Sequence, residues 1–475
     1  MDQRFDMIVI GTGFAGTFFL WEALKHLGPR ARVLVLERGK MRDQSWQLAN
    51  KGALLAHGRR SYKNANRKKP WRFSVGVGGS SNCWVGCTPR MLPEDFELQS
   101  RYGVGRDWPI SYDELEVDYV SAERVMSISG PDNTALFPRS APYPQPPHLL
   151  HKPDQLLQKA YPGLYFNMPT ARSRLGTDSR GACCNNSRCQ LCPLDAKFTI
   201  LNGLMAPLHD PRVTLLTSAR ADALELKGGR IDGVAYRHGG RDKRARADFV
   251  ALSANALFNA SLLLSSGLKG PEVGKGLVEQ VSLRADVLLD GLDSFQGSTY
   301  LTGHGYMLYG GEHRRERAAG LIETKNRPDL RLERGKWRQR LKLKVIYEDL
   351  PQAFNTVEAT KDVMRPARAN FKKRSDYAKR ALERCESDLE RVLAPLPVES
   401  ISVEKRPDGT ESHIMCTAVM GKDPAKSVVD PQLIHHKVRN LAVLGASAFP
   451  TAAPANPTLT LSALSIRSAR FTFGS

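Results

Sequence analysis

The sequence lacks any apolar run long enough to cross a bilayer, and its first expected core strand begins within a few residues of Met1. We therefore expect no cleaved export leader. These absences predict a cytoplasmic protein by default, or a periplasmic or membrane-associated one if a partner carries it across a membrane. Of the 475 residues, 41% are hydrophobic and 25% are charged, which is typical of a folded globular protein.

Acidic residues are scarce relative to basic ones, because 49 Asp and Glu face 69 Lys and Arg, which gives a formal charge of +20. Such a charge suggests nucleic acid, but the basic clusters lack interleaved aromatic residues and any DNA-binding motif. No nucleic-acid partner is therefore expected. Solvated faces, or a patch for an acidic protein or an anionic membrane surface, explain the charge better. The clusters are Arg59–Lys69, His313–Arg317, Arg327–Lys344 and Arg365–Arg380.

The first forty residues carry the pattern around which the chain is organised. A short apolar run, Met7–Ile10, leads directly into a G-x-G-x-x-G turn at Gly11, Gly13 and Gly16. The run is too short for a helix and is typical of a buried strand. The three glycines permit a tight turn, close approach to a pyrophosphate and close helix packing, in that order. The helix expected over residues 17–27 then directs its N-terminus at phosphate groups.

A second expected strand, Arg32–Leu36, ends at Glu37, whose carboxylate is spaced to accept from a ribose 2′-hydroxyl. An acid here favours NAD or FAD over NADP. A glycine-rich turn without a ligand is the alternative, but strand, helix, second strand and terminal acid all occur in order. The predicted cofactor-binding residues of this region are Gly11, Gly13, Phe14, Ala15, Gly16, Glu37 and Arg38.

A second glycine turn occurs between Trp71 and Phe96, where two glycines precede two serines and supply hydroxyl and N–H donors. Together with Asp107–Leu115, this segment resembles the glucose–methanol–choline (GMC) family of flavin oxidoreductases. The resemblance implies that the segment lies along FAD near its isoalloxazine ring. The residues concerned are Gly78, Gly79, Ser80, Ser81, Asn82 and Cys83.

Two local patterns concern helix and surface positions. Ser111 is expected to cap a helix that runs to about Val125, with Glu114 as its capping-box partner. His435 and His436 precede an expected strand and are predicted to lie on the surface.

The C-terminal stretch gives the second strong resemblance to the GMC family. His413–Gly421, Asn440–Thr451 and Asn456–Thr460 are similar to the family's C-terminal signature. The family's catalytic pair is a histidine followed by a histidine or asparagine, which the resemblance assigns to His413 and Asn456. It further implies FAD contacts at Ala221, Ala254, Gly445, Ala446, Asn456, Pro457 and Thr458.

These residue types suit alcohol oxidation. Imidazole has a pKa suited to taking the hydroxyl proton near neutral pH while hydride leaves carbon for flavin N5. An amide at Asn456 can hold the substrate oxygen without competing for the proton. Asn456 and Pro457, just before a helix, also direct N–H dipoles at the pyrimidine end of the flavin. A buried structural histidine is the alternative interpretation of His413.

Four of the eight cysteines lie within ten residues, at Cys183, Cys184, Cys189 and Cys192. This clustering is unlike the disulfides of a large secreted enzyme and indicates a reducing compartment or a metal site. The spacing resembles that of the flavoprotein subunits of bacterial glucose, gluconate and fructose dehydrogenases. This resemblance implies a 3Fe-4S iron–sulfur cluster on Cys183, Cys184 and Cys189, with Cys192 as a spare or fourth ligand. Structural zinc and reduced thiols stay open, and no haem-attachment C-x-x-C-H motif is present.

The fold expected is α/β, with a discontinuous Rossmann-like FAD-binding domain and a substrate domain whose antiparallel sheet is covered by helices. The FAD-binding domain is expected over residues 1–274 and 411–475, with an inserted loop and the cysteine-rich segment at 131–200. Residues 275–410 are expected to form the substrate domain. Its expected elements are strands at Ser282–Leu289, Leu341–Tyr347 and Asn355–Ala359, and one long charged helix from about Pro366 to Leu393.

The predicted function is therefore FAD-dependent oxidation of an alcohol, with sugars and polyols among the candidates, to a carbonyl. Electrons are expected to pass through the cysteine cluster to an acceptor other than oxygen, because a simple oxidase has no use for such a cluster. An electron-accepting protein or a small partner subunit follows from the same resemblance. The alternatives are a GMC oxidase that makes hydrogen peroxide, and a non-oxidative flavoprotein that is an isomerase, a lyase or an assembly partner.

Overall fold

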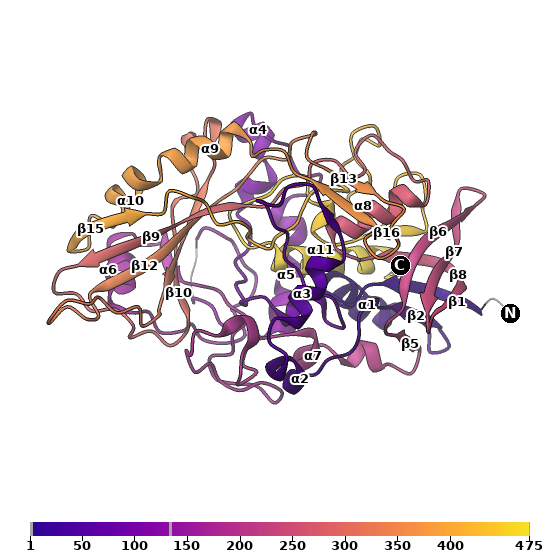
Figure 1. Ribbon diagram of the computed structural model, residues 1–475, viewed down its shortest axis with the longest axis horizontal. Helices are drawn as coiled ribbons and strands as arrows, with labels where there is room; N and C mark the ends of the chain where they lie inside the picture. Colours follow the sequence, from indigo (N-terminus) through magenta and orange to yellow (C-terminus); the bar gives the residue numbers. More distant parts are fainter. Residues whose placement is uncertain (1–2, 133–134, 475) are drawn as a thin grey trace.

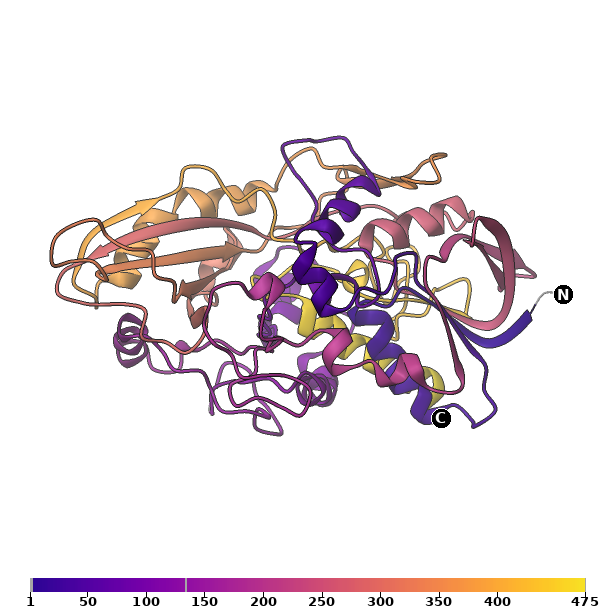
Figure 2. The same ribbon diagram turned by 60° about the horizontal axis from the view of Figure 1, so that its bottom comes forward.

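Three β-sheets organise the chain in the computed structural model, which describes residues 3–132 and 135–474. Residues 133 and 134 of the predicted insertion 131–200 lie outside the described part. A seven-stranded sheet lies at the end that carries the N-terminus, and a six-stranded sheet lies at the opposite end (Figure 1). The same separation is visible in the turned view of Figure 2. Mixed parallel and antiparallel sheets with covering helices confirm the predicted α/β class.

The seven-stranded sheet is built on the N-terminal strand. β1 (Gln3–Ile10) pairs in parallel with β2 (Val33–Leu36) and with β8 (Arg241–Leu252). Beyond β2 the sheet is extended by β5 (Val213–Leu216). The four residues of Met7–Ile10 and the nearby Phe5 are buried, and Asp6 between them is exposed.

On the other side of β1, β8 pairs with different strands at its two ends. The first half of β8 pairs in antiparallel fashion with β7 (Arg230–His238), which in turn pairs with β6 (Arg220–Lys227). The end of β8 pairs in parallel with β16 (Leu441–Val443). The C-terminal segment therefore returns to the seven-stranded sheet, close to the glycine turn.

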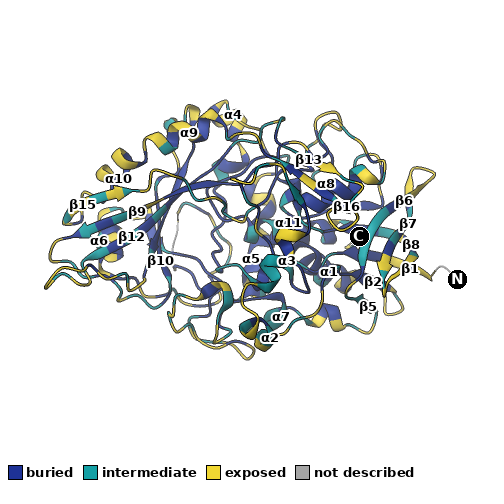
Figure 3. Ribbon diagram, viewed as in Figure 1, coloured by how far each residue is buried: buried dark blue, intermediate teal, exposed yellow. Residues whose placement is uncertain are grey.

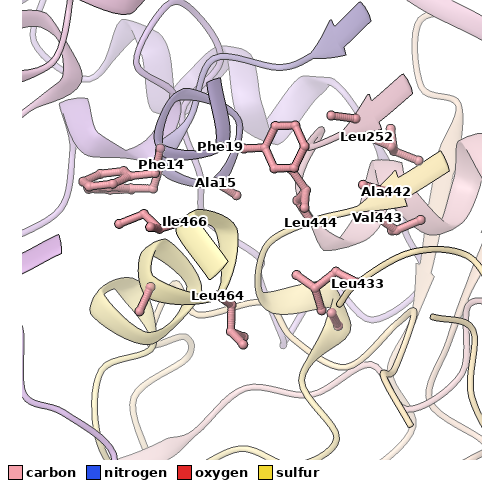
Figure 4. Packing of buried hydrophobic residues seen from close by; sticks show 14 of the residues in the cluster. Phe14, Ala15, Phe19, Leu252, Leu433, Ala442, Val443, Leu444, Leu464 and Ile466 are labelled. Carbon is pink, nitrogen blue, oxygen red and sulfur yellow. The ribbon is translucent and has the colours of Figure 1, made fainter. Parts of the chain in front are cut away.

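Three helices pack beside this sheet. α1 (Phe14–His26) contacts α11 (Thr458–Phe473), and α11 contacts α5 (Tyr112–Met126). Figure 4 shows the apolar side chains of α1, α11 and β16 packed together. The predicted capping box opens α5, because Glu114 N donates to Ser111 Oγ (3.2 Å) and Ser111 N donates to the Glu114 carboxylate (2.8 Å).

The six-stranded sheet is antiparallel throughout, and its two faces differ. Apolar residues of its strands point to one face, where α9 (Asp376–Glu383) and α10 (Cys385–Leu393) cover them. Both helices have buried inner and exposed outer faces (Figure 3). Polar residues point to the other face, toward the centre of the molecule. In spatial order the strands are β15 (Val398–Val403), β9 (Val281–Leu289), β12 (Arg340–Tyr347), β11 (Gly320–Lys325), β10 (Leu301–Leu308) and β4 (Tyr165–Asn167).

The single long helix predicted from about Pro366 to Leu393 is wrong. Its first part is β14 (Ala367–Asn370), which pairs with β13 (Thr356–Ala359) and β3 (Lys63–Asn64) in a third, three-stranded sheet. The helical part begins only at Ser375, whose hydroxyl caps α9 by accepting from Ala378 N at 3.1 Å. Backbone pairing with distant strands thus replaces the first helical turns.

The prediction that His435 lies on the surface is also wrong. Its side chain is 6% exposed, and its Nδ1 accepts hydrogen bonds from the backbone N–H groups of Lys437 (3.2 Å) and Val438 (3.1 Å). His436 is half-buried.

The remaining helices are short, and none of the helices in the described ranges is long and apolar enough to cross a membrane. They are α2 (Gln44–Ala49), α3 (Ala53–Arg60), α4 (Leu98–Tyr102), α6 (Lys152–Ala160), α7 (Ile200–Gly203) and α8 (Ala256–Ser265).

Candidate active site

A cavity of about 590 Å³ lies where the N-terminal turn, the polar face of the six-stranded sheet and the C-terminal segment meet. The predicted nucleotide-binding end is lined by the glycine turn and by residues of β6. The opposite end is lined by strand residues of β9, β11 and β12 together with His413 and Asn456. One cavity thus joins the predicted cofactor residues to the predicted catalytic pair.

The glycine turn gives the three glycines different surroundings. Gly11 has φ +99°, and a Cβ there would collide with the carbonyl oxygen of Ser253. A Cβ on Gly16 would collide with the carbonyl oxygen of Gly11. A Cβ on Gly13, in contrast, has no atom within 4 Å, because Gly13 faces the open cavity. Gly11 and Gly16 are therefore required by the fold, and Gly13 leaves room for a ligand at the N-terminus of α1.

Glu37 lies in the wall of the same end of the cavity and is 6% exposed. Its carboxylate is held by Thr12, whose hydroxyl (2.8 Å) and N–H (3.2 Å) donate to Oε2. Gly39 N donates to Oε1 at 2.7 Å. Each carboxylate oxygen has further lone pairs, so the fixed carboxylate can still accept from a ligand hydroxyl.

Most of the predicted cofactor residues line the cavity, and four do not. Ser81 accepts from Ile200 N (3.0 Å) and donates to Gly78 O (2.7 Å), while the Asn82 amide donates to Val77 O (2.9 Å). These hydrogen bonds fix the shape of the second glycine turn from outside the cavity lining. The four outside the lining are Gly16, Gly78, Ser81 and Asn82. Those that line it are Gly11, Gly13, Phe14, Ala15, Glu37, Arg38, Gly79, Ser80, Cys83, Ala221, Ala254, Gly445, Ala446, Asn456, Pro457 and Thr458.

The hydrogen-bond partner of His413 determines the tautomer of its imidazole ring. Its Nδ1 lies 2.6 Å from Oε1 of Gln280. The Gln280 amide nitrogen donates to the carbonyl oxygens of Ala453 and Ala455, both at 2.8 Å, which leaves only the amide oxygen to face the ring. His413 Nδ1 must therefore carry the hydrogen, and the Nε2 lone pair is free to accept a proton. No sequence pattern identified Gln280, which lies 133 positions before His413.

Burial lowers the pKa of His413 to about 4, with a raising contribution from Glu279, a lowering one from Lys344 and a raising one from Glu323. The imidazole is therefore neutral at physiological pH and able to act as a base. Glu279 also accepts from His413 N (3.2 Å) and forms a buried ion pair with Lys69. The backbone of His413 is thus anchored to a charged pair beneath the cavity.

Asn456 is 7% exposed and lines the cavity. Its side-chain amide forms no hydrogen bond within the described ranges, and Oδ1 is buried without a partner. A buried amide without a partner is costly unless a ligand satisfies it. Asn456 directly precedes Pro457 and α11, whose N-terminal residue Thr458 also lines the cavity.

These observations fit FAD. The open space at Gly13 and the N-terminus of α1 suit a pyrophosphate, and the Glu37 carboxylate suits a ribose hydroxyl. The unpartnered amide of Asn456 and the N-terminus of α11 suit the polar edge of a flavin or the oxygen of a substrate.

The four clustered cysteines differ in exposure. Cys184 is exposed, Cys189 is buried, and Cys183 and Cys192 are intermediate. Within residues 3–132 and 135–474, no three His, Cys, Asp or Glu side chains are grouped so that they could hold a metal ion. The cysteines therefore do not fit a metal centre as they are arranged, and no step of the chemistry is derived through one.

Two buried cations lie beside these cysteines. Burial lowers the pKa of the Arg172 guanidinium, but the thiols of Cys189, Cys87 and Cys183 raise it above its ordinary value. Lys197 Nζ donates to the carbonyl oxygens of Trp84 (2.8 Å) and Gln190 (3.0 Å). Neither cation forms an ion pair with a carboxylate of the described ranges.

Comparison with known proteins gives matches to one family. Residues 346–465 match the family model of the GMC oxidoreductases. The fructose dehydrogenase large subunit of Gluconobacter japonicus is 25% identical over 98% of this chain and 97% of its own length. The 6'''-hydroxyparomomycin C oxidase of Streptomyces lividus is 27% identical over 99% of this chain and 91% of its own length.

A solved structure shares the fold. Pyridoxine 4-oxidase from Mesorbium loti has a TM-score of 0.68 and 18% sequence identity, with 99% of both chains covered. The two chains thus share the same overall fold.

Proposed function

Because the chain is a GMC oxidoreductase, an FAD-dependent enzyme that acts on the CH–OH group of alcohols or sugars, we propose that His413 and Asn456 carry its reaction. His413 would remove the hydroxyl proton, and Asn456 would hold the oxygen while the alcohol becomes a carbonyl. Residues 1–274 and 411–475 would hold FAD, and residues 275–410 would supply the substrate wall.

The observation that carries this proposal is the pair formed by His413 and Gln280. It supports a neutral imidazole with a free Nε2 in the cavity wall, which is the form that a general base requires. Bound FAD would supply the hydride acceptor. As the proton moves to Nε2 the ring becomes cationic, and the nearby Glu279 and Glu323 carboxylates favour that charge.

Asn456 supports the second role. Its unsatisfied amide can donate to or accept from the substrate hydroxyl and so fix the oxygen for proton removal. An amide does not titrate in the working pH range, so it leaves the proton to His413.

Substitution of His413 tests the assignment. In a His413→Ala variant we expect FAD to stay bound while the rate of flavin reduction by alcohol falls about 10²- to 10⁴-fold, the usual worth of a positioned base. The rate is measured by anaerobic stopped-flow absorption. His209→Asn, at an exposed histidine, is the control and should leave the rate unchanged. An unaltered rate in His413→Ala would overturn the assignment of the base. A wild-type protein whose flavin no alcohol reduces would favour a non-oxidative flavoprotein.

For the second half-reaction we propose an acceptor other than oxygen, reached through an electron-accepting protein or small partner subunit. The name of the Gluconobacter relative supports a dehydrogenase. In the described ranges Cys183, Cys184 and Cys189 are not grouped so that they could hold a metal ion, so the proposed electron transfer is not routed through them.

An oxidase that makes hydrogen peroxide is the second candidate, favoured by the name of the Streptomyces relative. Oxygen uptake during turnover with an alcohol, compared with turnover on an artificial electron acceptor, decides between the two. Slow oxygen uptake with rapid turnover on the artificial acceptor supports the dehydrogenase. Rapid oxygen uptake with hydrogen peroxide formed supports the oxidase.

A further inference from the structure

The polar face of the six-stranded sheet forms a charged wall opposite the nucleotide-binding end of the cavity. Because side chains alternate along a strand, the residues that do not face α9 and α10 point to the opposite face of the sheet, and several charged ones among them line the cavity. On β11 these are Glu323 and Lys325, on β9 Arg284, and on β12 Lys344. His413 lines the same cavity, so any substrate that reaches the base also meets this wall.

Two of the three cations in the wall already have carboxylate partners. Arg284 Nη2 lies 2.8 Å from Asp408. Lys344 Nζ lies 3.2 Å from Asp408 and 2.5 Å from Glu411. Lys325 has neither an ion pair nor a hydrogen bond from its ammonium group to any residue in the described ranges. It is the cation of this wall that is left for a ligand.

The surroundings of Lys325 oppose its charge. Burial lowers the pKa of Lys325, and the repulsion from Arg284 and Lys344 lowers it further, against smaller raising effects of Glu323 and Asp408. A negative group that enters the cavity beside Lys325 would relieve this repulsion and restore a paired ammonium. A positive group would add to the repulsion.

Glu323, two residues away on the same face, is suited to hydroxyl groups. Burial raises the pKa of Glu323, but His304, 3.4 Å from its carboxylate, and the nearby Lys344 and His413 lower it below its ordinary value. The carboxylate is therefore ionised and can accept hydrogen bonds from neutral hydroxyls. Its charge is balanced by these neighbours, so it has no need of a further cation.

We propose that Lys325 binds an oxyanion group on the substrate, a carboxylate or a phosphate, so that the enzyme acts on an anionic polyhydroxy alcohol whose hydroxyls donate to Glu323. This inference rests on the proposed function, and it specifies the chemical class of the alcohol. The geometry assigns the anionic end to Lys325 and the end that is oxidised to His413.

Binding of four probes that share a six-carbon hydroxylated chain tests the proposal. They are D-gluconate, D-glucitol 6-phosphate, neutral D-glucitol and cationic D-glucamine, titrated into the FAD-loaded protein by calorimetry. We expect one or both anions to bind about 10- to 100-fold more tightly than D-glucitol, as a charge-assisted hydrogen bond provides, and D-glucamine to bind most weakly. The anion that binds more tightly identifies the preferred group as carboxylate or phosphate.

Three variants make the test specific to Lys325. Lys325→Gln should abolish the preference for anions, and Lys325→Arg should keep most of it. Lys342→Gln is the matched control, because Lys342 is the cross-strand neighbour of Lys325 on β12 but lies outside the cavity lining, 3.6 Å from Asp329. It should retain the preference. Bound FAD and circular dichroism establish that each variant is folded.

The outcomes separate this proposal from the proposed function. Titrations into His413→Ala protein should give the same preference, because binding does not require the base. Equal affinity of anions and D-glucitol, tighter binding of D-glucamine, or an unchanged preference in Lys325→Gln would overturn the role of Lys325. A preference for anions without alcohol oxidation would leave that role intact and refute the proposed reaction instead.

Discussion

At the residue scale, the proposed base depends on an amide that is remote in the sequence. The Gln280 amide nitrogen donates to two backbone carbonyls, and its oxygen accepts from His413. These hydrogen bonds fix which imidazole nitrogen carries the hydrogen. Burial then keeps the ring neutral. The two effects together present a free Nε2 in the cavity wall without a carboxylate bonded to the ring.

The pH dependence of alcohol oxidation should follow the pKa of His413. Because protonated His413 cannot act as a base, kcat/KM should fall on the acid side with a midpoint near pH 4. Lys344→Gln removes a positive charge that lowers the pKa of His413, so this midpoint should move up. Stopped-flow flavin reduction across the pH range measures the midpoint.

Glu323→Gln should shift the acid midpoint of kcat/KM in the opposite direction. Glu323 raises the pKa of His413, so its neutralisation should move the acid midpoint down. An acid midpoint that shifts in neither variant would show that another group limits the reaction at low pH.

The sequence indicated His413 and Asn456 because each lies in a contiguous motif. Gln280 and Lys325 could not be predicted in the same way. The role of each depends on a neighbour from a distant segment, as with the pairing of β11 and β12 that places Lys325 near Lys344. Such contacts leave no local spacing in the sequence.

At the element scale, the strand, glycine turn and helix at the N-terminus agree with expectation, because their signals are local: a short apolar run, glycines at fixed spacing and a helical run. The region 366–393 does not, because its first residues pair with β13 and β3 instead of continuing a helix. A local pattern of charged and apolar residues does not reveal that strands distant in the sequence supply backbone hydrogen bonds.

The glycine turn allows a test that separates folding from FAD binding. Gly13→Ala should leave the apoprotein as stable as the parent, because no atom lies within 4 Å of the added methyl group, yet FAD binding should fall sharply as the methyl occupies the pyrophosphate position. FAD content after reconstitution and the Tm of the apoprotein measure the two effects.

Gly28→Ala is the matched control, since its methyl group also meets no atom within 4 Å and Gly28 lies outside the cavity lining. It should retain FAD. A Gly13→Ala protein with full FAD content would show that the cofactor phosphate does not approach this turn.

At the scale of the whole molecule, the stability of the protein should decline in mild acid. Burial lowers the pKa values of His148, His413 and His435 to about 4, from an ordinary value of 6.5. The unfolded chain therefore takes up these protons first as the pH falls. The stabilisation is complete above pH 6.5 and is lost toward pH 4, at up to about 4 kcal/mol per pH unit for three groups.

His435→Asn tests this dependence. The variant keeps a side-chain acceptor for the N–H groups that His435 binds but removes one titrating group, so this slope should fall by about one third. Guanidinium unfolding at several pH values between 4 and 7 measures it. An unchanged slope would mean that His435 does not contribute to acid destabilisation.

The overall arrangement explains why one cavity serves both halves of the proposed reaction. The C-terminal segment returns through β16 to the sheet of the glycine turn and brings His413 and Asn456 between that sheet and the charged wall of β9, β11 and β12. Sequence patterns predicted the class of both sheets. That the two sheets face each other across the cavity follows only from the long-range packing.

Anaerobic mixing of the FAD-loaded wild-type protein with a panel of neutral and anionic polyols is the most direct test of alcohol oxidation in this cavity. At least one alcohol should bleach the visible absorption band of oxidised flavin, with its carbonyl product recovered in equal amount to the flavin reduced. Failure of every alcohol to bleach a flavin that dithionite reduces readily would contradict the proposed function.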